Sequence, residues 1–116
     1  MKVLSVRYCS VSSDAQRLAD FFDALGLTRK SFGESVESLF SGAIFAAGDD
    51  WIEIWPSSSG MRDGFMLQIV VDDADAYAAH ARSRGLQPNG PVNAHGERIY
   101  FLEAPSGLKV SIQSKF

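Results

Sequence analysis

The chain has 116 residues, enough for one domain with a buried core and too few for two ordinary domains. Its residues are 46% hydrophobic and 22% charged, and no apolar run approaches the roughly 20 residues that a membrane span needs. The formal net charge of −3 argues against nucleic-acid binding, which requires a basic surface. A single cysteine, Cys9, excludes an internal disulfide and a thiolate metal cluster. Polar residues interrupt the apolar start of the chain, so we expect no signal peptide and a cytoplasmic protein.

In chain order, the first half predicts one helix among strands. A strand ends near Val11, and a helix of about three turns follows, with Asp14 as the expected N-cap and Gly26 as the expected stop. Turn signals containing glycine then separate three strand-like runs, at residues 27–34, 37–48 and 50–56. The polar stretch PSSSGMRDG, residues 56–64, predicts a linker.

The second half repeats the first at an offset of 59 residues. Val11 pairs with Val70, Asp14 with Asp73 and Gly26 with Gly85, all without a gap. Any two strand–helix units can share a capping aspartate and a glycine stop, but several ungapped identities favour duplication. Strand-like runs follow the second helix at residues 86–92, 97–103 and 108–114. The order βαβββ thus occurs twice. We predict a single domain, residues 1–116, made of two modules of about 1–56 and 64–116.

These modules carry a family resemblance over nearly the whole chain. Two βαβββ units, the stretch VDDADAYAAHARSRG at residues 71–85, and a G-x-R…P-x-G pattern at 96–98 and 105–107 resemble the vicinal oxygen chelate superfamily. That superfamily includes glyoxalase I, extradiol dioxygenases, fosfomycin-resistance enzymes and bleomycin-resistance proteins. The resemblance implies an α+β fold in which two tandem βαβββ modules form a curved mixed sheet, a cup with helices outside and the ligand inside.

The resemblance also implies where a metal would lie. Enzymes of the superfamily mostly hold a divalent metal with His and Glu from four strand positions, two on the first strand and two on the last strand of the modules. Carried over to this chain, the four positions hold Arg7, Glu53, Met66 and Ser111. Only Glu53 is a good ligand for Zn, Fe, Mn or Ni, and the fixed cation of Arg7 repels a divalent metal. We therefore expect no metal and no cofactor.

The stretch WIEIW, residues 51–55, puts bulky apolar side chains on both faces of a predicted strand. If Glu53 faces the cup, alternation turns Trp51 and Trp55 the same way and the isoleucines toward the helix. The two indoles then offer flat walls on which a planar ligand can stack. Glu53 could pair with a ligand cation or with Arg7, and both pairings remain open at this stage.

Strand alternation and the resemblance together give the remaining candidates. The predicted ligand-binding residues are Trp51, Glu53, Trp55, Arg7, Met66, Gln68, Phe40, Phe32, His95 and Ser111. The apolar residues predicted to point back toward a helix include Leu4, Val6 and Tyr8. His95 lies in the loop before the penultimate strand, at the expected rim of the cup.

Several other residues have a structural interpretation beside a functional one. Phe32, Phe40 and Phe45 belong to the middle strands of the first module, where the facing of each ring depends on whether Gly42 marks a bulge. Ordinary core packing is the alternative for each of them. No histidine is placed to activate Cys9, so we expect a buried structural thiol. We expect His80, in the second helix, to be solvated or half-buried.

The favoured function is non-enzymatic binding and sequestration of a planar aromatic small molecule, such as an antibiotic, that could be cationic. It resembles the role of the drug-binding bleomycin-resistance proteins. The alternative is a glyoxalase- or dioxygenase-like lyase or isomerase with an atypical metal site, or with Glu53 as base. A third alternative is a structural or regulatory module whose cup is filled by its own side chains. Relatives often build pockets between two chains, so we expect a homodimer, with modules that can be swapped.

Overall fold

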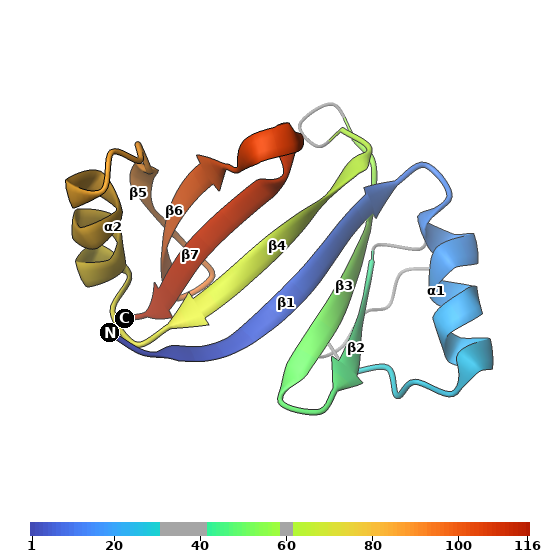
Figure 1. Cartoon of the computed structure of the whole chain (residues 1–116). Coiled ribbons are helices and arrows are strands. Elements are labelled where there is room, and N and C mark those ends of the chain that lie inside the picture. The colour runs from blue at the N-terminus through green and yellow to red at the C-terminus, as the bar shows by residue number, and fades with distance from the viewer. Residues whose placement is uncertain (31–41, 59–61) are drawn as a thin grey trace. The chain divides into compact units, whose positions relative to one another are not determined.

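The computed structural model describes residues 1–30, 42–58 and 62–116. These residues form seven strands, two α-helices and one 3-10 turn, in the order β1 α1 β2 β3 β4 α2 β5 β6 η1 β7 (Figure 1). The expected α+β class is confirmed. In the part of the chain that is described, neither helix is long and apolar enough to cross a membrane.

The chain forms two compact units. The first unit is Arg7–Phe65, and the second unit is Met1–Val6 together with Met66–Phe116. The first six residues belong with the second unit, where the backbone N–H of Lys2 donates to Asp72 Oδ1 at 2.9 Å. Each unit has its own hydrophobic core.

The first unit contains β1 (Val3–Ser12) from Arg7 onward, α1 (Ala15–Leu25), β2 (Ala43–Ala47) and β3 (Asp50–Pro56). Its strands lie in the order β2-β3-β1, with β3 parallel to β1 and antiparallel to β2. The predicted strand 50–56 is confirmed. Of the predicted strand 27–34, Arg29 forms an isolated antiparallel bridge with Phe45, and the positions from 31 onward lie outside the described residues.

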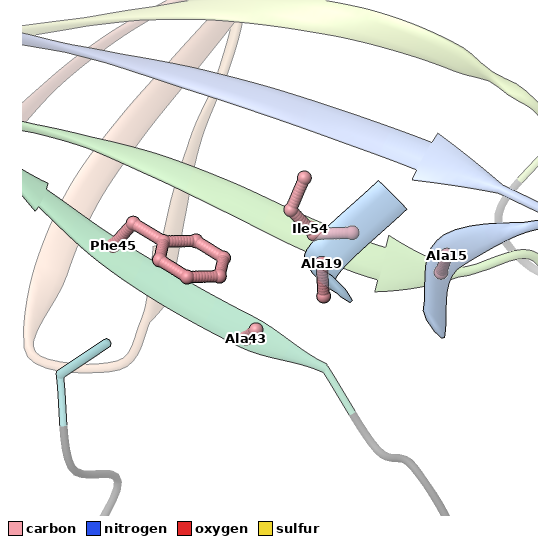
Figure 2. Close-up of a cluster of buried hydrophobic side chains, with 5 residues drawn as sticks. All are labelled: Ala15, Ala19, Ala43, Phe45 and Ile54. Atoms are coloured by element: carbon pink, nitrogen blue, oxygen red, sulfur yellow. The ribbon is translucent and has the colours of Figure 1, made fainter. Parts of the chain in front are cut away.

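The core of the first unit lies between its sheet and α1. Alternation along β3 directs Ile54 toward Ala15 and Ala19 of α1, and β2 adds Ala43 and Phe45 (Figure 2). Phe45 is completely buried here, so core packing, the alternative for this ring, is what the structure has. Glu53 of β3 therefore lies on the opposite face of the strand from this core.

The back of β1 is not covered as predicted. Tyr8 is 41% exposed and stacks on Phe65, itself 56% exposed, with ring centroids 5.9 Å apart. Leu4 and Val6, in the second unit, are exposed as well. The expectation that these side chains pack against a helix is wrong, and for Tyr8 the reason is that α1 packs over β2 and β3.

The second unit contains a complete βαβββ order. Its elements are β4 (Gly64–Val71) from Met66 onward, α2 (Ala74–Ser83), β5 (Asn89–Ala94), β6 (Glu97–Glu103), the 3-10 turn η1 (Pro105–Gly107) and β7 (Lys109–Lys115). The strand order is β4-β7-β6-β5, with β4 parallel to β7. Val71, Ala74, Ala78 and Tyr100 form the core between this sheet and α2.

The two helices begin at positions related by the offset of 59, but their caps differ. Asp73 accepts a hydrogen bond from the backbone N–H of Ala76 at 3.1 Å, so it caps α2 as predicted. Asp14 accepts no such bond, and its own N–H donates instead to Ser12 Oγ at 3.0 Å. Asp73 has the extended backbone that aims a cap side chain at the first turn, whereas Asp14, with φ −103° and ψ 29°, does not.

Candidate ligand-binding site

Strand β3 places three side chains of the candidate site on one face. Trp51, Glu53 and Trp55 alternate with Ile52 and Ile54, which pack toward α1. The strand therefore separates a core face from a face with one carboxylate between two indoles, as its alternation predicted.

The carboxylate of Glu53 is held by both indoles. Trp51 Nε1 donates to Glu53 Oε2 at 2.8 Å, and Trp55 Nε1 donates to Glu53 Oε1 at 3.0 Å. Glu53 is only 8% exposed, and a buried carboxylate requires such donors. Each carboxylate oxygen thus has an N–H donor, and each indole is fixed at its polar edge. We refer to these three residues as the WEW cluster.

Two cations lie over the ring of Trp51. The Arg7 guanidinium carbon is 4.1 Å from the ring centroid, and Lys30 Nζ is 4.3 Å from it. Arg7 comes from β1, paired in register with Trp51, and Lys30 comes from the segment after α1. Such contacts contribute about 0.5–1 kcal/mol at exposed sites. From the sequence, Glu53 could pair with a ligand cation or with Arg7. In the structure, its described hydrogen-bond donors are the two indoles.

Trp55 packs against a glycine. Gly42 has φ +131°, and a Cβ atom added there would collide with the six-membered ring of Trp55. Gly42 directly precedes β2. The Trp55 ring can pack against the backbone at the start of this strand only because position 42 carries no side chain.

Cys9 lies next to Glu53 in the parallel register of β1 and β3. Burial and, to a lesser extent, the negative charge of Glu53 together raise the pKa of the Cys9 thiol from 9.0 to about 12. The thiol is therefore protonated at neutral pH, which suits a structural role and not a nucleophile.

The second unit has positions equivalent to those of Arg7, Cys9, Trp51 and Glu53. Cys9 pairs with Glu53 in the first unit, and Gln68, which the offset relates to Cys9, pairs with Ser111 in the second. Ser111 is thus the counterpart of Glu53, as the sequence predicted. Met66 pairs with Lys109, the counterpart of Trp51.

A buried polar chain replaces the WEW cluster in the second unit. Ser111 Oγ donates to Gln113 Oε1 at 2.7 Å, and Gln113 Nε2 donates to Glu97 Oε1 at 2.8 Å. All three residues are buried. Gln68 Oε1 is buried too, and it has no hydrogen-bond partner among the described residues.

A shallow groove lies beside this chain in the second unit. It has a volume of about 180 Å³ and is lined by Met66, Asn89, Phe101, Leu102, Glu103 and Lys109. Lys109 Nζ contacts Glu103 Oε2 at 2.9 Å at its edge. Of the predicted site residues, the structure therefore brings Met66 to a groove and places Gln68 and Ser111 in the next row of the same sheet face.

The remaining candidates lie apart from these groups. His95 is exposed in the tight turn between β5 and β6, with φ +53°, several residues along β6 from the groove-lining Phe101. His80 is exposed on α2, one of the two settings expected for it. Phe32 and Phe40 lie outside the described residues.

The residues at the four metal positions of the resemblance do not fit a divalent cation. Both oxygens of Glu53 accept indole N–H bonds, and the guanidinium of Arg7 lies beside the adjacent Trp51. Within residues 1–30, 42–58 and 62–116, no group of three or more His, Cys, Asp or Glu side chains is arranged to hold a metal.

Sequence reasoning missed Lys30, Glu97 and the packing role of Gly42. The positive charge of Lys30 beside a tryptophan could not be inferred from spacing, because a turn brings it to β3 from the end of α1. Alternation could have placed Glu97 with Gln113 once the β6–β7 register was known.

Comparisons with known proteins place the fold. No family model matches the chain, and no curated protein sequence matches it. Solved structures do match. A hypothetical protein from Bacillus halodurans C-125 has a TM-score of 0.73 at 17% identity, covering 99% of this chain and 94% of that one. Methylmalonyl-CoA epimerase from Mycobacterium tuberculosis has a TM-score of 0.66 at 19% identity, covering 98% and 87%.

A third solved structure carries the superfamily in its own name. It is a glyoxalase/bleomycin resistance protein/dioxygenase superfamily member from Vibrio splendidus 12B01, with a TM-score of 0.67 at 12% identity, covering 98% of this chain and 100% of that one. At these identities the likeness concerns the fold alone. Together with the repeated strand–helix order and the parallel pairing of the first and last strands in each unit, it shows that the chain has the vicinal oxygen chelate fold.

Proposed function

We propose that this chain binds and sequesters a planar aromatic small molecule in the cytoplasm, without transforming it chemically. The observation that carries the proposal is the WEW cluster, in which a buried carboxylate fixes two indoles on one strand face. Rigid aromatic side chains lose little conformational entropy when a ring stacks on them, so they favour affinity for flat ligands.

Sequestration requires only binding. A protein present in excess over its Kd for a toxic ring compound lowers the free concentration of that compound by mass action. The same arrangement argues against catalysis by Glu53 as a base, because both of its oxygens already accept hydrogen bonds from indoles. Elemental analysis tests the alternative: a stoichiometric metal in the purified protein would favour a lyase or isomerase with an atypical site.

Ligand titration tests the proposal directly. Purified protein is titrated with a panel of planar antibiotics and dyes, and binding is measured by calorimetry and tryptophan emission. We expect micromolar or tighter binding of some members, and loss of about tenfold in affinity for Trp51→Leu, in line with the cost of losing an aromatic stacking partner.

Matched variants separate the site from stability. Phe21→Leu removes an exposed aromatic ring from α1 and is expected to leave affinity unchanged. Trp51→Phe retains a ring without the N–H, so it reports on stacking even if Trp51→Leu is unstable. If no compound of the panel binds although the proteins are folded, the proposal is contradicted. That result would favour a module whose cup is filled by its own side chains.

We further propose a homodimer with two equivalent sites, which could form by swapped modules. The support is the exposed aromatic pair Tyr8 and Phe65, because adjacent exposed rings of this kind mark association surfaces. Light scattering after gel filtration measures the mass. The Tyr8→Ser and Phe65→Ser double variant is expected to shift the protein toward monomer, and a wild-type monomer at all concentrations would contradict the dimer.

A further inference from the structure

We infer that the ligand of the WEW cluster is a planar aromatic anion: a flat ring system bearing a carboxylate, sulfonate or phosphate group. This inference rests on the proposed function and specifies the charge of its ligand. It reverses the sequence-based expectation that the ligand could be cationic, for reasons of geometry around Trp51.

The first reason is that Glu53 is committed within the protein. Its two oxygens accept from Trp51 Nε1 and Trp55 Nε1 at 2.8 and 3.0 Å, and the residue is 8% exposed. A ligand cation would have to compete with both indole N–H donors for this carboxylate, and an indole N–H that lost its acceptor would cost free energy. The carboxylate therefore organises the indoles and is a poor ligand for a cation.

The second reason is that positive charge already occupies the ring of Trp51. Arg7 and Lys30 lie 4.1 and 4.3 Å from the ring centroid. A cationic ligand stacking on this ring would compete with like charges for one quadrupole. An anionic ligand would meet complementary charge over the same ring.

Lys30 is the residue that gives the site this selectivity. It is exposed, and its described contact is the Trp51 ring, held by a flexible four-carbon side chain. When a flat ring stacks on Trp51, the ammonium can move from the indole face to an anionic group on that ring without leaving the site. A weak cation–π contact is exchanged for an ion pair.

The charges that face the cluster agree with this assignment. The positively charged groups of Arg7 and Lys30 contact the Trp51 ring, and the carboxylate of Glu53 is held by the two indoles. Asp50 precedes Trp51 on β3, and alternation directs it to the other face of the strand. Cys9, beside Glu53, contributes no charge near neutral pH because its thiol is protonated.

Three probes with one ring system test the charge preference. Naphthalene-2-sulfonate is anionic, 2-naphthylmethanol is neutral and N,N,N-trimethyl-2-naphthylammonium is cationic. The Kd of each is measured by calorimetry at low salt for the wild-type protein and for Lys30→Gln, Lys30→Glu and Arg17→Gln. Arg17 is exposed on α1, which packs on the opposite face of the same sheet, so Arg17→Gln is a matched loss of one positive charge.

We expect the anion to bind most tightly and the cation least tightly. Lys30→Gln should weaken anion binding by about threefold, as expected for one exposed ion pair, and leave the neutral probe within about twofold. Lys30→Glu should weaken anion binding further, so that the difference in affinity between the anionic and the cationic probe becomes smaller or changes sign. Arg17→Gln should change none of the three, and added salt should weaken only the anion.

Two results would overturn the inference, and they are distinguishable. If the neutral or cationic probe binds as tightly as the anion, or Lys30→Gln affects all three equally, the charge assignment is wrong while the proposed function stands. If no probe binds and the wider panel of planar compounds also fails, the proposed function is wrong and the inference falls with it.

Discussion

The two units use the same strand pairing to hold different chemistry. In the first unit the central carboxylate, Glu53, is satisfied by indole N–H groups from its own strand. At the matching position in the second unit stands Ser111, which donates into a chain through Gln113 to Glu97 on the next strand. The first cluster lies on a single strand and is built around two aromatic rings, whereas the second crosses strands and contains only polar, non-aromatic side chains.

This difference shows what a repeated module conserves. In both units the first and last strands pair in parallel, and a helix packs on the core face of the sheet. The side chains on the other face share almost nothing. Backbone pairing and a buried apolar face are enough to define the module, so the second face is free to diverge toward binding.

The largest effect on stability is expected from a substitution that disrupts the WEW cluster. Glu53→Ala removes the acceptor of two indole N–H groups and is expected to lower the free energy of unfolding by about 2–4 kcal/mol, measured by urea denaturation. Glu53→Gln retains one acceptor oxygen and should cost less. Glu103→Ala, which removes an exposed partner of Lys109, is the control and should stay within about 0.5 kcal/mol. If Glu53→Ala leaves the free energy of unfolding unchanged, the packing of the two indoles does not depend on the carboxylate.

The equivalent change in the second unit should be milder. Ser111→Ala removes the hydroxyl that donates to Gln113 and changes the side-chain volume little, with an expected loss of about 1–2 kcal/mol in the free energy of unfolding. Gln113 can then turn its amide toward other partners, a choice that the indoles of the first unit lack. A loss as large as that of Glu53→Ala would remove the contrast between the units.

The two helix caps offer a matched pair at smaller scale. Asp73→Ala removes the bond to the Ala76 N–H and should cost about 1 kcal/mol by denaturant unfolding. Asp14→Ala, at the repeat-related position, should change stability by less than about 0.5 kcal/mol, because Asp14 makes no side-chain cap bond. Equal losses would show that Asp14 caps α1 in solution.

The smallest effect is confined to alkaline pH. The folded protein retains the Cys9 proton up to a pKa of about 12, whereas the unfolded chain releases it near 9.0. The free energy of unfolding should therefore fall as the pH rises above 9.0, and the fall should be shallower in Cys9→Ala. Identical pH profiles for the two proteins would show that the thiol does not titrate differently on folding.

Much of the fold could be predicted from local pattern. The two helices start where the aspartates and the offset place them, strand β3 has the predicted bounds, and the alternation of WIEIW separates core from site. Capping signals were less reliable, since Asp14 and Asp73 look alike in sequence but have different backbone angles. The angle depends on how the chain leaves the preceding strand, which is a tertiary property.

The sequence by itself determined which residues share a strand face, because alternation is a property of the extended backbone. It did not determine that Ser111 is the counterpart of Glu53, because the ungapped offset of 59 leads to Ile112; that assignment came from the family resemblance. Only the tertiary structure decided what Glu53 and Trp51 contact. Indole rotamers aim both N–H groups at one carboxylate, and the turn after α1 brings Lys30 onto Trp51. Side-chain rotamers and contacts distant in sequence leave no periodic trace, so the charge of the site could be inferred only after folding.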